Sequence, residues 1–215
     1  ATLSVAGLAQ TFGGSLAIDG TLTGDGLVEG DTTIGGLHAP GGAAAGTQTF
    51  SHDLFYQQTG VSLPKVDWRL EANAAVSSGG TSFDQIVVQN NLFFGVKTDV
   101  NMKFDGPGST VDWNDSYWSQ DRSFVMYDVA GTTTGADRLQ ASTGQAYYDS
   151  NHRSLNAIRP DASFGIQERG NKVEVVYYAT PEPSTWAMAA GAAGVAGLAG
   201  WRRKRRRGIA RFSPR

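Results

Sequence analysis

Glycine spacing constrains the fold of the first fifty residues more than any other feature. Between positions 13 and 46, glycines recur every four to six residues and separate very short runs with apolar positions at Leu16, Ile18, Leu22, Leu27, Ile34 and Leu37. Strands of three or four residues between glycine corners favour a β-solenoid, in which each coil stacks on the last and buries a narrow column of aliphatic side chains. Ordinary hairpins are the alternative, because Asp-Gly also signals type I′ turns.

Beyond residue 50 the β-rich segments become longer. Residues 66–72, 83–94, 96–104 and 123–129 have β-rich composition, and residues 164–178 predict a closing hairpin that turns at Arg169, Gly170 and Asn171. A convincing helical period is missing before Pro181, and the best short candidate lies around 137–141. We therefore expect an all-β body, with solenoid coils over residues 1–50 and a strand-rich body or cap over residues 51–179.

Charge divides the chain into an acidic body and a basic tail. The formal net charge is -2, yet residues 1–201 carry 10 Lys and Arg against 20 Asp and Glu, and the other eight basic residues lie in the last fourteen positions. The chain has no cysteine, which excludes disulfides, thiol nucleophiles and zinc sites built on thiolates.

An uncharged segment separates the body from this tail. As a helix at ~1.5 Å per residue, residues 184–201 would be roughly 27 Å long, close to the ~30 Å hydrocarbon core of a bilayer. Trp186 and Trp201 lie where the aromatic belts of a membrane helix would fall. The cluster that follows would remain cytoplasmic and consists of Arg202, Arg203, Lys204, Arg205, Arg206 and Arg207. We expect one transmembrane helix over residues 186–201 and a basic tail over residues 202–215.

Two alternatives apply to this region. The segment is rich in Ala and Gly, so it is also compatible with a buried or disordered linker. The basic tail would attract nucleic acid or anionic lipid. Beside an apolar segment the topogenic role is the simpler interpretation, and we expect no nucleic-acid partner.

Two prolines around one acid mark the start of the C-terminal region. Pro181, Glu182 and Pro183 exclude helix and hold residues 180–185 extended, as a processing enzyme would require. Followed by the Ala/Gly-rich helix and the arginine cluster, they resemble the PEP-CTERM sorting signal of exported proteins in Gram-negative bacteria. Residues 180–215 depart from that pattern in their eight residues after the arginines and in their low leucine content.

The resemblance implies recognition by an exosortase, an integral-membrane enzyme similar to cysteine transpeptidases, with processing near Pro-Glu-Pro. It also implies a path: anchoring in the inner membrane with the basic tail cytoplasmic, then release to the cell envelope, cell surface or extracellular matrix. The sequence at Ala1 has no initiating Met, basic region or long apolar run. We therefore expect the chain to be a processed form or a fragment of a longer precursor.

The body has a second resemblance. Its elements are Pro40-Gly41-Gly42, Gly46-Thr47-Gln48-Thr49-Phe50 and Phe83-Asp84-Gln85-Ile86-Val87-Val88. In this order they resemble a passenger-type β-helix of the autotransporter-associated kind, in which such segments close the C-terminal end of a longer solenoid. The resemblance implies a structural or adhesive role.

Motifs for catalysis are missing from the sequence. It contains no His-Glu-x-x-His, Gly-x-Ser-x-Gly, Walker loop or dinucleotide-binding glycine motif after a strand. Ser51, His52 and Asp53 could compose a catalytic set, but adjacent residues on a strand point to opposite faces and would not converge. We expect no enzymatic activity and no cofactor.

Residues 112–118 are the most concentrated polar and aromatic stretch. Oxygen ligands at Asp112, Asn114 and Asp115 make a weak calcium candidate, but the glycine and distal Glu of an EF-hand are missing, and short acidic loops are usually solvated turns. Trp113, Tyr117 and Trp118 are candidate glycan contacts, although tryptophans of an all-β body are more often core or cap residues. The sequence thus predicts a non-enzymatic structural or adhesive protein. The alternative is a carbohydrate-binding module with the same sorting signal and with exopolysaccharide as a candidate partner.

Overall fold

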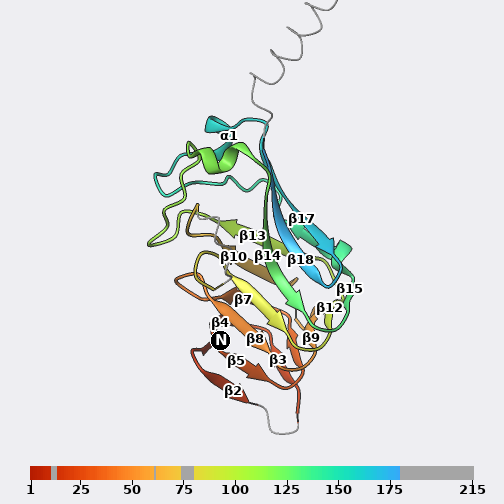
Figure 1. The fold of residues 1–215 in the computed structure, drawn as a ribbon. Coiled ribbons are helices and arrows are strands. Elements are labelled where there is room, and N and C mark those ends of the chain that lie inside the picture. The colour runs from red at the N-terminus through yellow and green to blue at the C-terminus, as the bar shows by residue number, and fades with distance from the viewer. Residues whose placement is uncertain (11–13, 61, 74–79, 180–215) are drawn as a thin grey trace, which may run out of the picture. The chain divides into compact units, whose positions relative to one another are not determined.

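Three sheets of parallel strands make up most of the regular structure (Figure 1). The computed structural model describes residues 1–10, 14–60, 62–73 and 80–179. The first sheet contains, in order, β1 (Thr2–Val5), β4 (Thr21–Gly24), β7 (Leu37–Pro40), β10 (Lys65–Arg69), β13 (Thr98–Lys103) and β16 (Leu139–Ala141). The second contains β2 (Leu8–Gln10), β5 (Leu27–Glu29), β8 (Thr47–Phe50), β11 (Gln85–Val88) and β14 (Arg122–Val129), extended by β18 (Lys172–Tyr178) and β17 (Ser163–Arg169). The third contains β3 (Leu16–Ile18), β6 (Thr32–Ile34), β9 (Leu54–Tyr56), β12 (Leu92–Phe94) and β15 (Thr133–Thr134).

From β1 to β13, each strand pairs in parallel with the strand three places later. This one rule gives the strand order of all three sheets up to β16. Three consecutive strands therefore add one strand to each of the three sheets, and we call each such set a layer. The short helical segments lie at the C-terminal end of this series and are η1 (Ser116–Ser119), η2 (Ala136–Arg138) and α1 (Leu155–Ile158). Among the described residues, strands account for nearly all regular structure and the helical segments are at most four residues long, which confirms that the body is all-β.

Side chains of equivalent positions lie above one another in the core. In the first sheet Leu22 pairs with His38 and His38 with Val66, and all three are buried. The second sheet buries a similar column of Val28, Phe50, Val88 and Val129. Alternate residues of these strands point outward, as period-2 geometry requires. Each layer therefore covers the apolar side chains of the layer before it.

Glycine allows close approach where the chain turns between sheets. A Cβ atom at Gly26 would lie 2.1 Å from the carbonyl oxygen of Gly7, and one at Gly36 would lie 2.0 Å from that of Gly20. Real Cβ atoms do not approach backbone so closely, so these corners accept only glycine without a backbone shift. The predicted glycine corners are confirmed at these two positions.

An antiparallel hairpin and an aromatic cluster complete the C-terminal end. Strand β18 pairs antiparallel with both β14 and β17, and the hairpin turns at Gly170 with φ of 63°, as predicted. Beside it lies what we call the aromatic cluster, which contains Trp68, Phe83, Phe104, Trp113, Trp118, Phe124, Phe164 and Tyr177. This cluster covers the end of the core opposite to β1.

The structure differs from the sequence-based expectations at three places. Residues 1–179 form one compact unit, and the three sheets run across position 50 without a break, so residue 50 does not separate two parts of this unit. The helical candidate at 137–141 is a single turn, η2, followed by strand β16. Leu27 and Leu37 are only half-buried, while the neighbouring Val28 and His38 point into the core.

The predicted membrane helix, residues 186–201, lies outside the described residues. Among those that are described, no helix is long and apolar enough to cross a bilayer.

Candidate functional site

The two tryptophans predicted as glycan contacts lie in the aromatic cluster. Trp113 and Trp118 are fully buried, and their ring centroids are 4.8 Å apart in an edge-to-face arrangement. Tyr117 is partly exposed, but the guanidinium of Arg122 lies 4.3 Å from its ring centroid and covers that face. A sugar stacks on an exposed ring face, so these residues are core and cap residues as they stand in this structure.

The acidic residues of the same loop are used within it. Asp112 accepts hydrogen bonds from the Asn114 backbone at 2.8 Å and from Arg153 at 2.5 Å. Asp115 accepts from the Tyr117 backbone at 2.7 Å and so caps η1, whereas Asn114 is exposed. Over the described ranges, no three His, Asp or Glu side chains gather as metal ligands would. Asp112 and Asp115 thus each accept a backbone hydrogen bond within the loop.

A buried carboxylate that sequence reasoning missed organises this end of the body. Asp149 is fully buried and accepts hydrogen bonds from the backbones of Asn151 and Arg153, both at 2.9 Å, and from the Arg153 guanidinium at 2.8 Å. Burial alone would raise its pKa, but the bonds from Arg153, Trp113 and Asn151 outweigh burial and lower it. Arg153 also reaches Asp112, so one arginine joins two loops of the cap.

Ser51 and His52 meet, contrary to the argument from strand geometry. Ser51 Oγ lies 2.8 Å from His52 Nδ1 because both residues lie in the bend after β8, where side chains do not alternate as on a strand. Asp53 instead accepts hydrogen bonds from the backbone and side chain of Asn91, both at 3.0 Å. The three residues thus form a structural corner and not a relay from acid to histidine to hydroxyl.

The core contains a chain of polar side chains that the sequence did not predict. His38 Nε2 lies 2.5 Å from Gln48 Oε1, His38 Nδ1 lies 2.5 Å from the Tyr56 hydroxyl, and the Tyr127 hydroxyl donates to Tyr56 at 2.9 Å. All four side chains are fully buried. With Gln48 Oε1 as acceptor, Nε2 of His38 carries the proton and Nδ1 accepts from Tyr56. Burial lowers the pKa of His38 to about 4, which keeps the ring neutral.

Another buried titratable group, Asp84, lies in the Phe83–Val88 segment. Asp84 accepts hydrogen bonds from the Gly46 backbone at 3.0 Å and from the Arg69 backbone at 2.9 Å. Burial raises its pKa to about 8 despite these bonds. Asp84 therefore ties strand β10 to the loop before β8, two elements that are distant in sequence.

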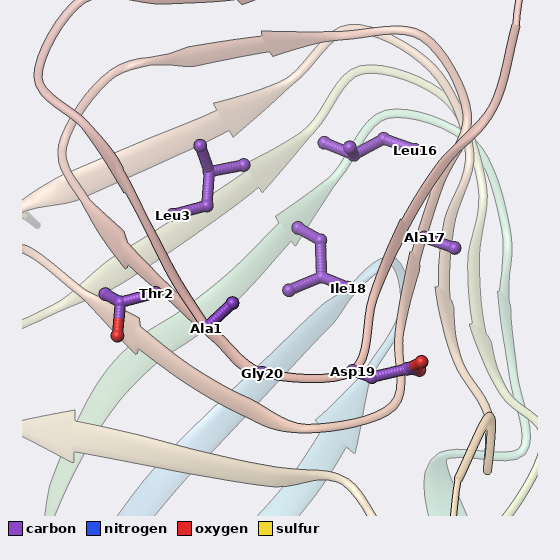
Figure 2. A pocket seen from close by; sticks show the side chains of 8 residues that line it. All are labelled: Ala1, Thr2, Leu3, Leu16, Ala17, Ile18, Asp19 and Gly20. Carbon is purple, nitrogen blue, oxygen red and sulfur yellow. The ribbon is translucent and has the colours of Figure 1, made fainter.

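A cavity of about 380 Å³ lies at the opposite end, beside β1 and β3 (Figure 2). Leu3, Leu16 and Ile18 line it, and Asp19 is its one ionisable side chain. The cavity contains none of the predicted site residues. Its lining is that of an exposed end of the core.

The end of β18 is the place where the body meets the predicted sorting signal along the chain. Tyr177 is fully buried, and its hydroxyl donates to the Trp118 carbonyl at 3.0 Å. The next side chain, Tyr178, is 44% exposed, and the backbone N–H of Ala179 donates to Asp121 Oδ1 at 2.8 Å. Because Asp121 is 58 positions from Ala179, no local sequence signal could have indicated this contact.

Pro181, Glu182 and Pro183, the flanking Trp186 and Trp201, and the basic cluster at 202–207 lie outside the described residues. No curated protein is significantly similar to the chain. Residues 179–206 match the PEP-CTERM protein-sorting motif, which indicates exosortase-dependent sorting of an exported protein that is processed at the envelope.

Proposed function

We propose that this chain is a non-enzymatic structural or adhesive protein of the cell envelope or extracellular matrix, with a β-solenoid body that an exosortase releases from a C-terminal anchor. The match of residues 179–206 to the sorting motif is the observation that carries the proposal. The order of its parts, a Pro-Glu-Pro element, an uncharged segment and a basic cluster, is that of a temporary membrane anchor with a cytoplasmic flank.

The layers support the solenoid part of the proposal. Each strand from β1 to β13 pairs in parallel with the strand three places later, and side chains stack in columns through successive layers. This is how a repeat architecture buries a continuous core from units that cannot bury their own apolar face. In this proposal the body is of the autotransporter-associated passenger type and presents its outer faces to the envelope or matrix.

Three groups of residues support a body without catalysis. His38 is fully buried with both ring nitrogens paired. Asp53, next to the Ser51–His52 contact, is bound to Asn91. Asp112 and Asp115 serve as loop caps. Each of these polar groups already has a structural partner.

Sorting is tested with the full precursor in matched hosts with and without an exosortase. In the exosortase-positive host the mature protein should lack the helix beyond Trp186, as measured by intact mass. In the negative host the complete chain should remain in the inner-membrane fraction. Retention of residues beyond Trp186 in both hosts would contradict the proposal.

Motif dependence is tested with Pro181→Ala and Pro183→Ala. Each replacement removes the fixed φ that holds the segment extended, so processing should slow or stop. Pro107→Ala is the matched control because Pro107 lies in an exposed loop of the body. Equal processing of all three variants and the unaltered protein would exclude recognition through the prolines.

The glycan-binding alternative no longer has Trp113 and Trp118 as its platform, since both are buried. A polysaccharide pull-down of the processed protein tests for contacts on the outer faces. Saturable binding to one polysaccharide class would favour a binding module over a purely structural role.

A further inference from the structure

Strand β18 has no free edge at the point where the body ends. Tyr177 pairs with Arg122 of β14 on one side and with Phe164 of β17 on the other. Enzymes that bind an extended peptide commonly pair with it along one edge, as an added strand. A strand already paired on both edges cannot be bound in that way unless it first leaves the sheet.

Side chains anchor the same end of the strand. The ring centroid of Tyr177 lies 4.8 Å from that of Trp118 and 5.2 Å from that of Phe164. Pulling residue 177 out of the sheet would expose this ring and break the bond of its hydroxyl to the Trp118 carbonyl. The last residues of β18 are therefore held by the core as well as by the sheet.

Asp121 extends this hold by one residue beyond the strand. It directly precedes β14 and accepts the Ala179 N–H at 2.8 Å. Two positions later, Pro181 has no N–H to donate and cannot make the same kind of bond. Ala179, the last described residue, is thus held by the body and lies two positions before the Pro-Glu-Pro element.

We propose that the folded body sets the N-terminal limit of exosortase processing, with Asp121 as the residue that positions the chain at that limit. This inference rests on the proposed function. The bond that is cut lies C-terminal to Ala179, so the mature protein retains the complete β18. In the cut, a peptide C–N bond breaks, the carbonyl carbon takes water or an acceptor amine, and the released peptide keeps the nitrogen as its amine.

Length variants at the boundary test the limit in the full precursor and an exosortase-positive host. Deletion of Thr180 brings the motif one residue closer to Asp121 and should slow processing. Insertion of Gly-Ser after Ala179 of the otherwise unaltered chain should give processing at or above the normal rate, with the cut still beyond Ala179. Two results would overturn the proposal: a mature C-terminus within residues 172–179, or a processing rate of the deletion variant equal to that of the insertion variant.

Asp121 is tested by hydrogen exchange on the full chain in detergent, a readout that does not depend on processing. Asp121→Ala removes a charged acceptor, so exchange at the Ala179 amide should rise about tenfold while exchange within β18 changes little. Asp121→Asn keeps an acceptor oxygen and should restore most of the protection. Asp105→Ala, at an exposed loop position, is the matched control.

The two experiments separate the possible failures. Without exosortase-dependent processing of any variant, including the unaltered chain, the proposed function fails and exchange alone decides the role of Asp121. Normal processing with unchanged Ala179 exchange in Asp121→Ala would refute the positioning role and leave the sorting function intact.

Discussion

His38 makes the stability of the body depend on pH. Its ring is fully buried and neutral, and burial lowers its pKa from 6.5 to about 4. Between pH 4 and 6.5 the unfolded chain binds a proton at His38 that the folded chain does not. The contribution of His38 to the unfolding free energy is therefore fully present above pH 6.5 and is lost as the pH falls toward 4. A difference of 2.5 pKa units at about 1.36 kcal/mol each amounts to about 3 kcal/mol.

Asp84 has the opposite effect over the same range. Its pKa is raised from 3.8 to about 8 by burial, so the folded state binds the extra proton, and its contribution to stability is lost as the pH rises toward 8. The two groups therefore oppose each other between pH 4 and 6.5. The pH-dependent contribution of each group is therefore measured by comparing the unaltered protein with a variant that lacks that group.

His38→Gln removes the titration and keeps a donor and an acceptor at that position. Urea unfolding of a chain ending at Ala179 should be measured from pH 4.5 to 7. The unfolding free energy of the unaltered protein minus that of His38→Gln should rise with pH, and its total change over the titration range should approach about 3 kcal/mol. The same difference calculated for Asp84→Asn should fall as the pH rises.

Parallel curves for His38→Gln and the unaltered protein would refute this reasoning. They would mean that His38 takes up a proton as easily in the folded state as in the unfolded chain. The chain of hydrogen bonds from Tyr127 to Gln48 would then be open to water or able to rearrange.

Other predictions concern the corners and the cap. Gly26→Ala places a Cβ 2.1 Å from a backbone oxygen and should lower the unfolding free energy by about 2 kcal/mol. Gly7→Ala meets no atom within 4 Å and should change the unfolding free energy by under about 0.5 kcal/mol. Equal effects of the two variants in urea unfolding would contradict the close-approach argument. Asp149→Asn removes a buried charged acceptor and should cost about 2 kcal/mol or more, against almost nothing for the exposed control Asp161→Asn. The stabilisation by Asp149 should be present above about pH 4 and be lost below it, since its folded-state pKa is lowered; an unfolding free energy of Asp149→Asn that keeps the full pH dependence below pH 4 would refute it.

Local spacing was enough to predict the short strands between glycines before residue 50 and the corners at Gly26 and Gly36, because glycine positions and short apolar runs act within a few residues. It was not enough to predict which residue of each run faces the core. In a strand of three or four residues, a shift of one position exchanges the two faces. The phase is set by how the preceding corner packs on the layer below, so Val28 and His38 point inward where Leu27 and Leu37 were expected.

Contacts over long sequence distances account for what remained hidden. Trp113 and Trp118 carry the same local signal whether they stack on a sugar or fill a cap, and only their packing against Phe164 and Tyr177 distinguishes the two. Asp149 and Asp121 form their bonds to Trp113 and Ala179 over 36 and 58 positions. Neither partner could be read from the neighbouring sequence.

The rule of strand order also has a consequence for how an exported chain acquires its structure. Paired residues of adjacent layers are 16 positions apart at Leu22 and His38, and 34 apart at Val66 and Val100. When such a chain emerges with its N-terminus first, each strand from β4 to β16 finds a partner that emerged before it, and the core can grow one layer at a time. Strand β18 is the last to find its place, between β14 and β17, and it is also the strand joined to the sorting signal. The closing of the second sheet and the appearance of the signal thus fall at the same moment in the emergence of the chain.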